Sequence, residues 1–253
     1  RVCGSKSARN FSLAYSNIIC IRSLTENALR QLSSRPQVMK VDVQFRLVGT
    51  DIPADHGYCL LSALARILPA LHGDEEVGVH PISGRLAGDR RLALTDRSRL
   101  TIRIDAGRIA EVLPLAGKSL VIDGSLIRVG TPQTRALVPS ARLYSRLVVI
   151  KGFLEPDVFL DAARRQLQAL SIGGEPRLVL RPAVAAANSG KPTGSRSPYV
   201  RRTIGIHGRQ VVGFALWVQN LTAEESIRLQ EYGLGGRRRF GCGIFVADRR
   251  GEA

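Results

Sequence analysis

Cysteine is scarce in this chain, and the few cysteines are far apart. The 253 residues include four, Cys3, Cys20, Cys59 and Cys242, and no two of them form a C-x-x-C pair. Zinc knuckles and disulfide frameworks both need cysteines at characteristic spacings. The sequence therefore predicts neither, no metal site and no cofactor are expected, and a reducing cytoplasm fits best.

Long apolar runs are missing as well. No stretch approaches the roughly 20 apolar residues that a membrane-spanning helix needs. The arginine-studded start also lacks a continuous apolar core followed by a small-residue cleavage site. We therefore expect a cytoplasmic protein without a membrane partner. Its hydrophobic content of 44% is ample for the core of a globular protein.

Acidic residues are too few to balance the basic ones. Asp and Glu number 21 against 37 Lys and Arg, which leaves a formal net charge of +16. An excess of this size favours a polyanionic partner such as a nucleic acid, because the chain otherwise repels itself. Arginine-rich composition can also follow from genomic base bias, so charge alone does not decide the function.

Methionine occurs once, at Met39, and the character of the sequence changes there. The run from Lys40 to Val48 looks like the opening strand of a domain. The preceding residues 1–38 start with Arg1 and show no sustained strand or helix period. We therefore expect Met39 to be the natural start and residues 1–38 to be a non-native or disordered N-terminal extension.

The first part of the chain predicts a β-α-β-β-α-β order. Apolar and polar residues alternate from Val41 to Leu47, as a half-buried strand requires. Asp55 is a candidate N-cap for a helix whose leucines recur at helical spacing until Gly73. Further strands are expected at residues 77–82, 100–104 and 119–129, with a short helix at 106–115.

The second part repeats this pattern. A strand is expected at residues 143–151, a helix at 156–170, a strand pair at 203–206 and 211–218 around His207-Gly208, and a last strand at 244–246. Between the strand pair and the last strand, Thr222-Ala-Glu-Glu225 has the form of a capping box and predicts a helix start.

Two such units in succession favour an α+β protein with tandem ferredoxin-like (RRM-like) domains. An antiparallel sheet of this kind leaves one face free for a ligand such as single-stranded RNA. We place the domains at residues 39–142 and 143–253. Residues 131–142, with their prolines, are interpreted as the linker, and residues 188–198 as a basic, mobile loop inside the second domain.

A glycine-rich loop near the C-terminus is the most informative stretch. It reads Gly233-Leu-Gly235-Gly236-Arg237-Arg238-Arg239-Phe240-Gly241-Cys242-Gly243. Glycines permit close approach of backbone amides to phosphate, and arginines are forked donors for phosphate oxygens. The loop lacks both the Gly-Lys-Ser/Thr of a Walker motif and the third glycine of the dinucleotide fingerprint. It can therefore bind a nucleic-acid backbone, although a turn with a solvated basic tip has the same composition.

This loop resembles a motif of the Cas-six-type CRISPR endoribonucleases, Gly-hydrophobic-Gly, five residues with a basic one, then Gly-hydrophobic-Gly. The strand at residues 212–218 and the segments at 53–58, 71–73 and 229–233 are similar to that family too. The resemblance, over residues 39–248, is greatest to the branch of type I effector complexes. It implies two ferredoxin-like domains, metal-independent cleavage of CRISPR repeats in the precursor transcript, and transfer of the mature guide RNA to effector-complex subunits.

Metal-free RNA cleavage uses the adjacent 2′-hydroxyl as nucleophile, leaves a cyclic phosphate, and needs a base and an acid. Histidine suits both roles near neutral pH, and the chain has four. By resemblance to different family members, His72 and His56 are almost equal catalytic candidates, at opposite ends of one expected helix. Tyr58 could hydrogen-bond the reacting hydroxyl or stack on a base, or it could be an ordinary half-buried tyrosine. His80 is expected to be structural, and His207 to contact RNA without catalysis.

Three further arginines, Arg201, Arg202 and Arg209, lie in or beside the predicted strand pair. They are ordinary solvated charges by default, but a hairpin carrying them could enter an RNA groove. Two other functions stay open: a non-catalytic RNA-binding subunit of a CRISPR effector complex, and a basic structural RNA-binding protein. The loss of cleavage without loss of binding, on changing His72 or His56, would separate the enzyme from the first.

Overall fold

The structure is a computed structural model that describes residues 39–181 and 197–247. Met39–Ala253 form one compact unit. The expected N-terminal extension, residues 1–38, and most of the expected loop at 188–198 lie outside the described residues.

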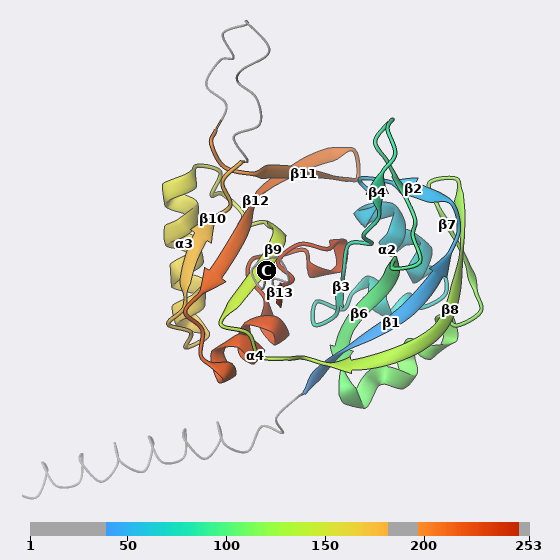
Figure 1. Cartoon of the computed structure of the whole chain (residues 1–253), viewed down its shortest axis with the longest axis horizontal. Coiled ribbons are helices and arrows are strands. Elements are labelled where there is room, and N and C mark those ends of the chain that lie inside the picture. The colour runs from blue at the N-terminus through green and yellow to red at the C-terminus, as the bar shows by residue number, and fades with distance from the viewer. Residues whose placement is uncertain (1–38, 182–196, 248–253) are drawn as a thin grey trace, which may run out of the picture. The chain divides into compact units, whose positions relative to one another are not determined.

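The first half of the unit, residues 39–136, is built on a five-stranded antiparallel sheet (Figure 1). Its main elements are β1 (Lys40–Val48), α2 (Gly57–Ala65), β3 (Gly78–Val79), β6 (Arg99–Asp105), β7 (Ser119–Ile122) and β8 (Ser125–Ala136). The strand order is β3-β6-β1-β8-β7. Apart from the edge strand β7, this is the order of the split βαβ arrangement, with the third strand between the second and the first.

The second half repeats this order. It consists of β9 (Arg142–Val148), α3 (Pro156–Ala169), β10 (Glu175–Leu178), β11 (Arg201–Ile206), β12 (Arg209–Gln219), α4 (Ala223–Tyr232) and β13 (Val246–Ala247). The sheet runs β10-β12-β9-β13, and β11 also pairs with β12, next to the stretch that pairs with β10. The prediction of two ferredoxin-like folds in tandem is confirmed.

Local signals in the sequence explain the helices of the second half. The Thr222 hydroxyl accepts a hydrogen bond from the Glu225 amide at 3.2 Å, and the Glu225 carboxylate accepts one from the Thr222 amide at 2.9 Å. The predicted capping box at the start of α4 is thus confirmed. Helix α3 begins with Pro156, whose fixed φ suits the first helical position, and it buries Phe159 and Leu167.

The first expected helix is two separate elements, so the prediction of a continuous helix to Gly73 was wrong. Helix α2 ends at Ala65, and the 3₁₀ helix η1 spans Pro69–His72. A proline disfavours helical backbone in the residue before it, and Leu68 has φ −125° and ψ 77°. The N-cap of α2 is His56 rather than Asp55.

Other boundaries differ from the expectation. Residues 106–115 form two 3₁₀ helices, η2 (Ala106–Glu111) and η3 (Leu113–Leu115). Residues 119–129 belong to the β7–β8 hairpin, which turns at Asp123-Gly124, a dipeptide typical of tight hairpins. Strand β8 continues to Ala136, through half of the expected linker.

Two features were not expected at all. Strand β10 contains Pro176, and proline is a weak signal for a strand. A small sheet with the order β2-β5-β4 joins β2 (Asp51–Pro53), β4 (Arg85–Leu86) and β5 (Arg91–Ala93). Its strands are two or three residues long, too short for a period to show.

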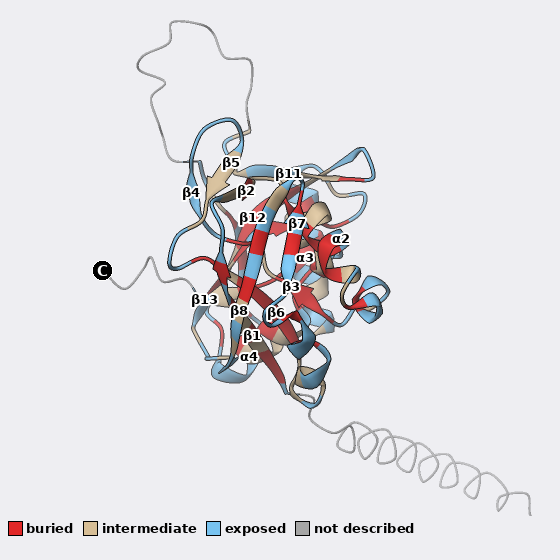
Figure 2. Ribbon diagram, turned by 90° about the vertical axis from the view of Figure 1, so that its right-hand side faces the viewer, coloured by how far each residue is buried: buried red, intermediate tan, exposed pale blue. Residues whose placement is uncertain are grey.

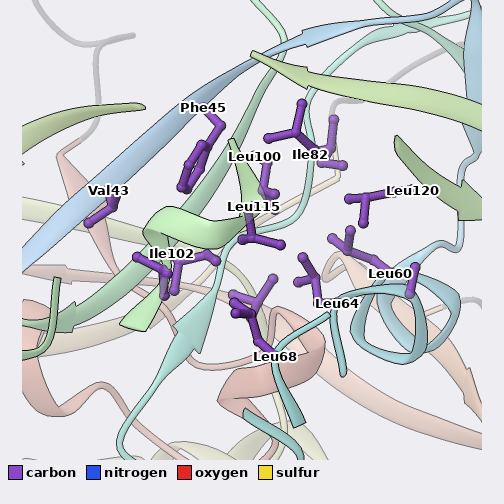
Figure 3. Close-up of a cluster of buried hydrophobic side chains, with 14 of the residues drawn as sticks. Val43, Phe45, Leu60, Leu64, Leu68, Ile82, Leu100, Ile102, Leu115 and Leu120 are labelled. Atoms are coloured by element: carbon purple, nitrogen blue, oxygen red, sulfur yellow. The ribbon is translucent and has the colours of Figure 1, made fainter. Parts of the chain in front are cut away.

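Each half has its own hydrophobic core. The first core packs leucine, isoleucine, valine and phenylalanine side chains of β1, β6, β7 and α2 (Figure 3). The second surrounds Phe159 of α3 and Phe214 of β12, whose ring centroids are 4.9 Å apart. Buried and exposed residues alternate along strands such as β7 (Figure 2). No helix in the described part of the chain is long and apolar enough to cross a membrane.

Candidate active site

A pocket of about 340 Å³ lies where α2, η1, the β11–β12 hairpin and the glycine-rich loop meet. Its lining residues are Tyr58, Leu61, Ser62, Ala65, Arg66, Pro69, His72, His207 and Phe240. The pocket is therefore lined by side chains that can transfer protons and by a cationic arginine, and the lining comes from both ferredoxin-like halves. We take this pocket as the candidate active site.

Tyr58 lies at the centre of the contacts in this pocket. Its hydroxyl is 3.4 Å from Nδ1 of His207, and the two rings meet edge to face with centroids 4.8 Å apart. The ring of Phe240, from the glycine-rich loop, lies nearly parallel to Tyr58 at 6.4 Å. A Cβ on Gly57 would lie 2.6 Å from the Phe240 carbonyl oxygen, so glycine at this position allows the loop to approach α2.

His207 lies at the tip of the β11–β12 hairpin. The pairing of Ile206 with Arg209 leaves a two-residue turn, and both of its residues have positive φ, 48° for His207 and 72° for Gly208. The hairpin was predicted correctly, but the contact with Tyr58 was not. The two residues are 149 positions apart, and neither carries a local signal of the contact.

His72 lies at the end of η1 and is exposed. Because Pro69 interrupts the helix, η1 is a separate element, and His72 lines the same pocket as Tyr58. Within the described residues, its ring has no hydrogen-bond partner. Both of its nitrogens are free to contact a substrate.

His56 is buried, and both of its ring nitrogens are used inside the protein. Nδ1 donates to the Pro53 carbonyl oxygen at 2.9 Å, and Nε2 accepts from the Ile82 amide at 2.9 Å. Burial lowers the pKa of this imidazole and favours its neutral form. No nitrogen remains to exchange a proton with RNA, so the equal ranking of His56 with His72 has no support in this geometry.

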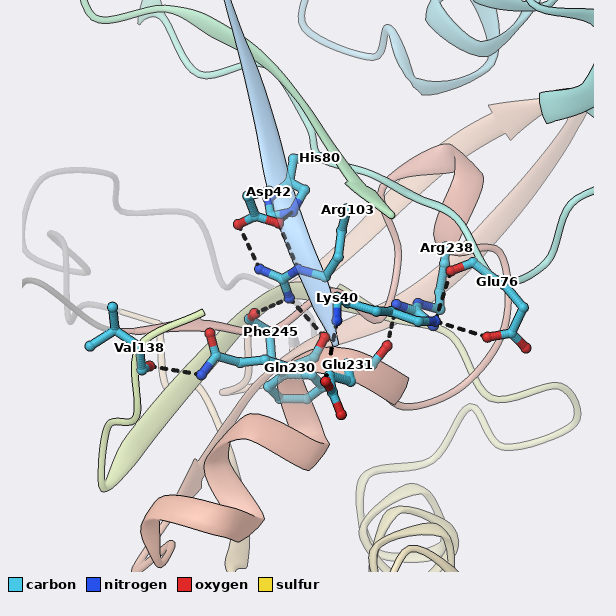
Figure 4. A network of polar contacts seen from close by, with 10 residues as sticks. All are labelled: Lys40, Asp42, Glu76, His80, Arg103, Val138, Gln230, Glu231, Arg238 and Phe245. Atoms are coloured by element: carbon cyan, nitrogen blue, oxygen red, sulfur yellow. Dashed lines mark hydrogen bonds and ion pairs between the residues drawn. The ribbon is translucent and has the colours of Figure 1, made fainter. Parts of the chain in front are cut away.

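His80 belongs to a polar network away from the pocket (Figure 4). Its Nε2 is 3.4 Å from Asp42, whose carboxylate receives two hydrogen bonds from Arg103 at 2.8 and 2.9 Å. Arg103 also donates to the carbonyl oxygens of Gln230 and Phe245, at 2.8 and 2.9 Å. The network ties β1 and β6 to α4 and to the residue before β13, a structural role like the one expected for His80.

Most glycines of the glycine-rich loop are explained by packing inside the protein. Gly233, Gly235, Gly241 and Gly243 have positive φ. A Cβ on Gly233, Gly235 or Gly243 would lie 2.1 to 2.2 Å from a backbone carbonyl oxygen. The amides of Gly235, Gly236 and Gly243 donate to Gln166, Val149 and Leu147. These amides are therefore not available for phosphate, and only Gly236 has open space beside it.

The three arginines of the loop differ in how far they are exposed. Arg238 is 9% exposed and donates to the Glu231 carbonyl oxygen at 2.7 Å. Burial, together with the nearby Arg103 charge, lowers the pKa of Arg238 to about 10. The expectation that Arg238 contacts RNA is thus contradicted by its burial. Arg237 is exposed and Arg239 is half-buried, so both can reach a ligand.

The hairpin arginines are on the surface. Arg201, Arg202 and Arg209 are exposed, and Arg201 lies 5.4 Å from the centre of the Phe214 ring. The hairpin is tied to the first half by Asp55, whose carboxylate accepts a hydrogen bond from the Gly205 amide at 2.8 Å. Asp55, expected as an N-cap, instead holds the hairpin beside α2.

The described residues contain no group of three or more His, Cys, Asp or Glu side chains that could hold a metal ion. Cys59 and Cys242 are free thiols, and burial raises the pKa of Cys242 to about 12.

The chain is similar to known proteins over most of its length. Residues 41–250 match the family described as Cas6 Crispr. A protein of Myxococcus xanthus (strain DK1622), named CRISPR-associated endonuclease Cas6, is 37% identical over 210 residues, which cover 83% of this chain and 82% of that protein.

Solved structures show the same fold at low sequence identity. A CRISPR-associated protein Cas6 superposes with a TM-score of 0.57 at 12% identity, over 83% of this chain and all of that one. A Cas6-related protein from Pyrococcus furiosus gives 0.55 at 13% identity, with the same shares covered. A protein described as an RAMP protein binding different RNA substrates gives 0.57 at 11% identity, over 82% of this chain and 98% of that one. By its family match and its 37% identical relative, the chain belongs to the Cas6 family of CRISPR-associated proteins.

Proposed function

We propose that this protein is the endoribonuclease that cuts CRISPR repeats in the precursor transcript to give mature guide RNAs. Its family and the name of its Myxococcus relative, an endonuclease, support this proposal. The observation that carries it is the pocket, which is lined by His72, Tyr58 and the exposed Arg66.

The chemistry proposed is metal-independent. The ribose 2′-hydroxyl attacks the adjacent phosphorus, and the products are a 2′,3′-cyclic phosphate and a 5′-hydroxyl. His72 takes the proton of the attacking hydroxyl, because its ring is exposed and has no partner among the described residues. Tyr58 donates a hydrogen bond to the reacting group, and Arg66 offsets the charge of the phosphorane.

Binding of the RNA is assigned to exposed and half-buried cations on the two segments that reach the pocket from the second half. These are Arg237 and Arg239 of the glycine-rich loop and Arg201, Arg202 and Arg209 of the hairpin segment. The glycines act by holding Phe240 and Arg237 in place rather than by binding phosphate themselves. We propose further that the mature guide RNA passes to the subunits of a type I effector complex.

The test is cleavage of a labelled RNA that contains the CRISPR repeat found beside the gene, in excess EDTA. Wild type should give one cut, and a 2′-deoxyribose at the cut position should prevent it. His72→Ala should lower the rate at saturating protein by about 100-fold or more, the usual size of an acid–base contribution, without loss of RNA binding. Tyr58→Phe should lower it less.

Three outcomes would contradict the proposal. A requirement for added Mg²⁺ would refute the metal-independent chemistry. Tight, repeat-specific binding without any cut would identify a non-catalytic RNA-binding subunit. Binding that unrelated RNA competes away, and that weakens steeply as salt is raised, would identify a basic structural RNA-binding protein.

A further inference from the structure

We infer that His207, from the hairpin of the second half, is the general acid of the cleavage reaction and works as a pair with His72. This inference rests on the proposed function. The residue that protonates the leaving group then comes from the second ferredoxin-like half. The other groups proposed to act in the reaction, His72, Tyr58 and Arg66, come from the first half.

The four histidines differ in whether their ring nitrogens are used inside the protein. Both nitrogens of His56 are bonded within the protein, and His80 lies beside Asp42 with a side chain 13% exposed. His72 and His207 are the two that are exposed, and they line the same pocket from different halves of the unit. Cleavage without metal needs two proton-transfer groups, and each of these two exposed imidazoles has at least one ring nitrogen without a hydrogen-bond partner among the described residues.

His207 is held in place on two sides. Asp55 accepts a hydrogen bond from the Gly205 amide, two residues before His207. Tyr58 contacts the His207 ring through its hydroxyl and through an edge-to-face ring contact. Because Nδ1 faces Tyr58, Nε2 is the nitrogen left to meet a substrate.

The backbone turn sets the position of His207. Its φ of 48° belongs to the left-handed region, in which histidine is enriched together with asparagine and aspartate. The two-residue turn therefore accommodates the histidine and places its imidazole at the hairpin tip, where it lines the pocket.

The proton balance of the reaction fits this assignment. As the bond from O2′ to phosphorus forms, His72 takes the proton of the 2′-hydroxyl. As the bond from phosphorus to O5′ breaks, the His207 imidazolium gives its Nε2 proton to O5′. The Tyr58 oxygen can accept a hydrogen bond from Nδ1–H of His207, which leaves Nε2 to face the leaving oxygen. After a proton exchange with water, the pair returns to its starting state.

The experiment compares wild type, His207→Asn and His72→Ala on two RNAs at saturating protein. One has the natural O5′ at the cut, and the other has sulfur in its place, a leaving group that departs without protonation. His207→Asn should cut the natural RNA about 100-fold more slowly and the sulfur RNA within about tenfold of wild type. His72→Ala should stay slow on both.

Asparagine is chosen because it suits the turn, so a folded variant is expected. Gly208→Asn is the matched control, since it changes the same turn, leaves His207 in place and has open space for its side chain; it should cut at close to the wild-type rate. In the pH–rate profile, His207→Asn should lose the alkaline limb, which a purely structural role would leave in place.

Cleavage of the natural RNA by His207→Asn at the wild-type rate would overturn the inference and leave the proposed function intact. So would a slow variant that the sulfur RNA does not rescue, because His207 would then only bind or position RNA. If wild type itself cuts neither RNA, the proposed function fails, and the inference fails with it.

Discussion

The network around Arg103 predicts how strongly the two halves stabilise one another. Arg103 is 1% exposed and makes four hydrogen bonds, two to Asp42 and two to the carbonyl oxygens of Gln230 and Phe245. Replacing it with methionine keeps much of the volume and removes all four. The bonds join strands of the first half to α4 and the C-terminal segment, so their loss should weaken the joint between the halves.

The magnitude follows from what the substitution leaves behind. Removal of one partner from a buried ion pair costs about 3 to 5 kcal/mol, because the other charge stays buried. Each carbonyl oxygen left without a donor adds about 1 kcal/mol or more. We therefore expect Arg103→Met to lower the free energy of unfolding by about 5 to 7 kcal/mol, a large share of the roughly 5 to 15 typical of a folded protein.

The assay is urea unfolding followed by circular dichroism, with two comparison variants. Arg177→Met breaks an ion pair whose side chains are 60% and 45% exposed, and it should change stability very little. The double variant Asp42→Asn with Arg103→Met removes both charges, so it should be more stable than Arg103→Met alone. If Arg103→Met cost no more than Arg177→Met, or if the double variant recovered nothing, the argument from an uncompensated buried charge would be refuted.

Three further predictions concern the loop and pH. Gly243→Ala should destabilise the protein by several kcal/mol, since its Cβ would lie 2.1 Å from a carbonyl oxygen at a φ of 66°, whereas Gly236→Ala should unfold at nearly the wild-type urea concentration. Arg237→Ala should weaken RNA binding and reduce its salt dependence by about one phosphate contact, as a filter-binding titration can measure. Stability should fall as the pH drops below about 6.5 and again below about 4. Burial lowers the pKa of His80, so unfolding takes up a proton at this group in the higher range. Burial alone would raise the pKa of Asp42, but hydrogen bonds from His80 and Arg103 hold it low, so unfolding takes up a proton there in the lower range. Urea midpoints that stay constant from pH 7.5 to pH 4 would contradict this.

The parts of the fold that the sequence predicts are those coded over a few residues. Alternation in β1, the helix expected at residues 156–170 and the capping box at Thr222 each act within one element, and each is confirmed. The sequence also contained a signal for the end of α2, because Pro69 disfavours helical backbone at Leu68. The helical spacing of leucines continues past this point, however, and favoured one long helix. The Asp123-Gly124 turn was a second local signal that a single-strand interpretation missed.

The candidate site depends on contacts that no local pattern encodes. Tyr58 and His207 are 149 residues apart, and Gly205 and Asp55 are 150 apart. His56 gave the same sequence signal as a catalytic histidine, yet the Ile82 amide and the Pro53 carbonyl oxygen use both of its nitrogens. A histidine's chemistry depends on which of its nitrogens are free, and that is decided by residues elsewhere in the chain.

The glycine-rich loop shows how a motif can mark a function without carrying its chemistry. Its glycines allow the loop backbone to pack closely against the end of β9, and they allow the two ends of the loop to pack against each other. The 3₁₀ helix η4 (Arg238–Phe240) then lies against α2. That position sets Phe240 beside Tyr58, and Gly57 makes the close approach possible. Substituting a packed glycine should therefore lower cleavage by displacing the pocket wall, and stability should fall in parallel. Substituting Arg237 should lower RNA affinity with stability unchanged, which separates the loop's structural part from its binding part.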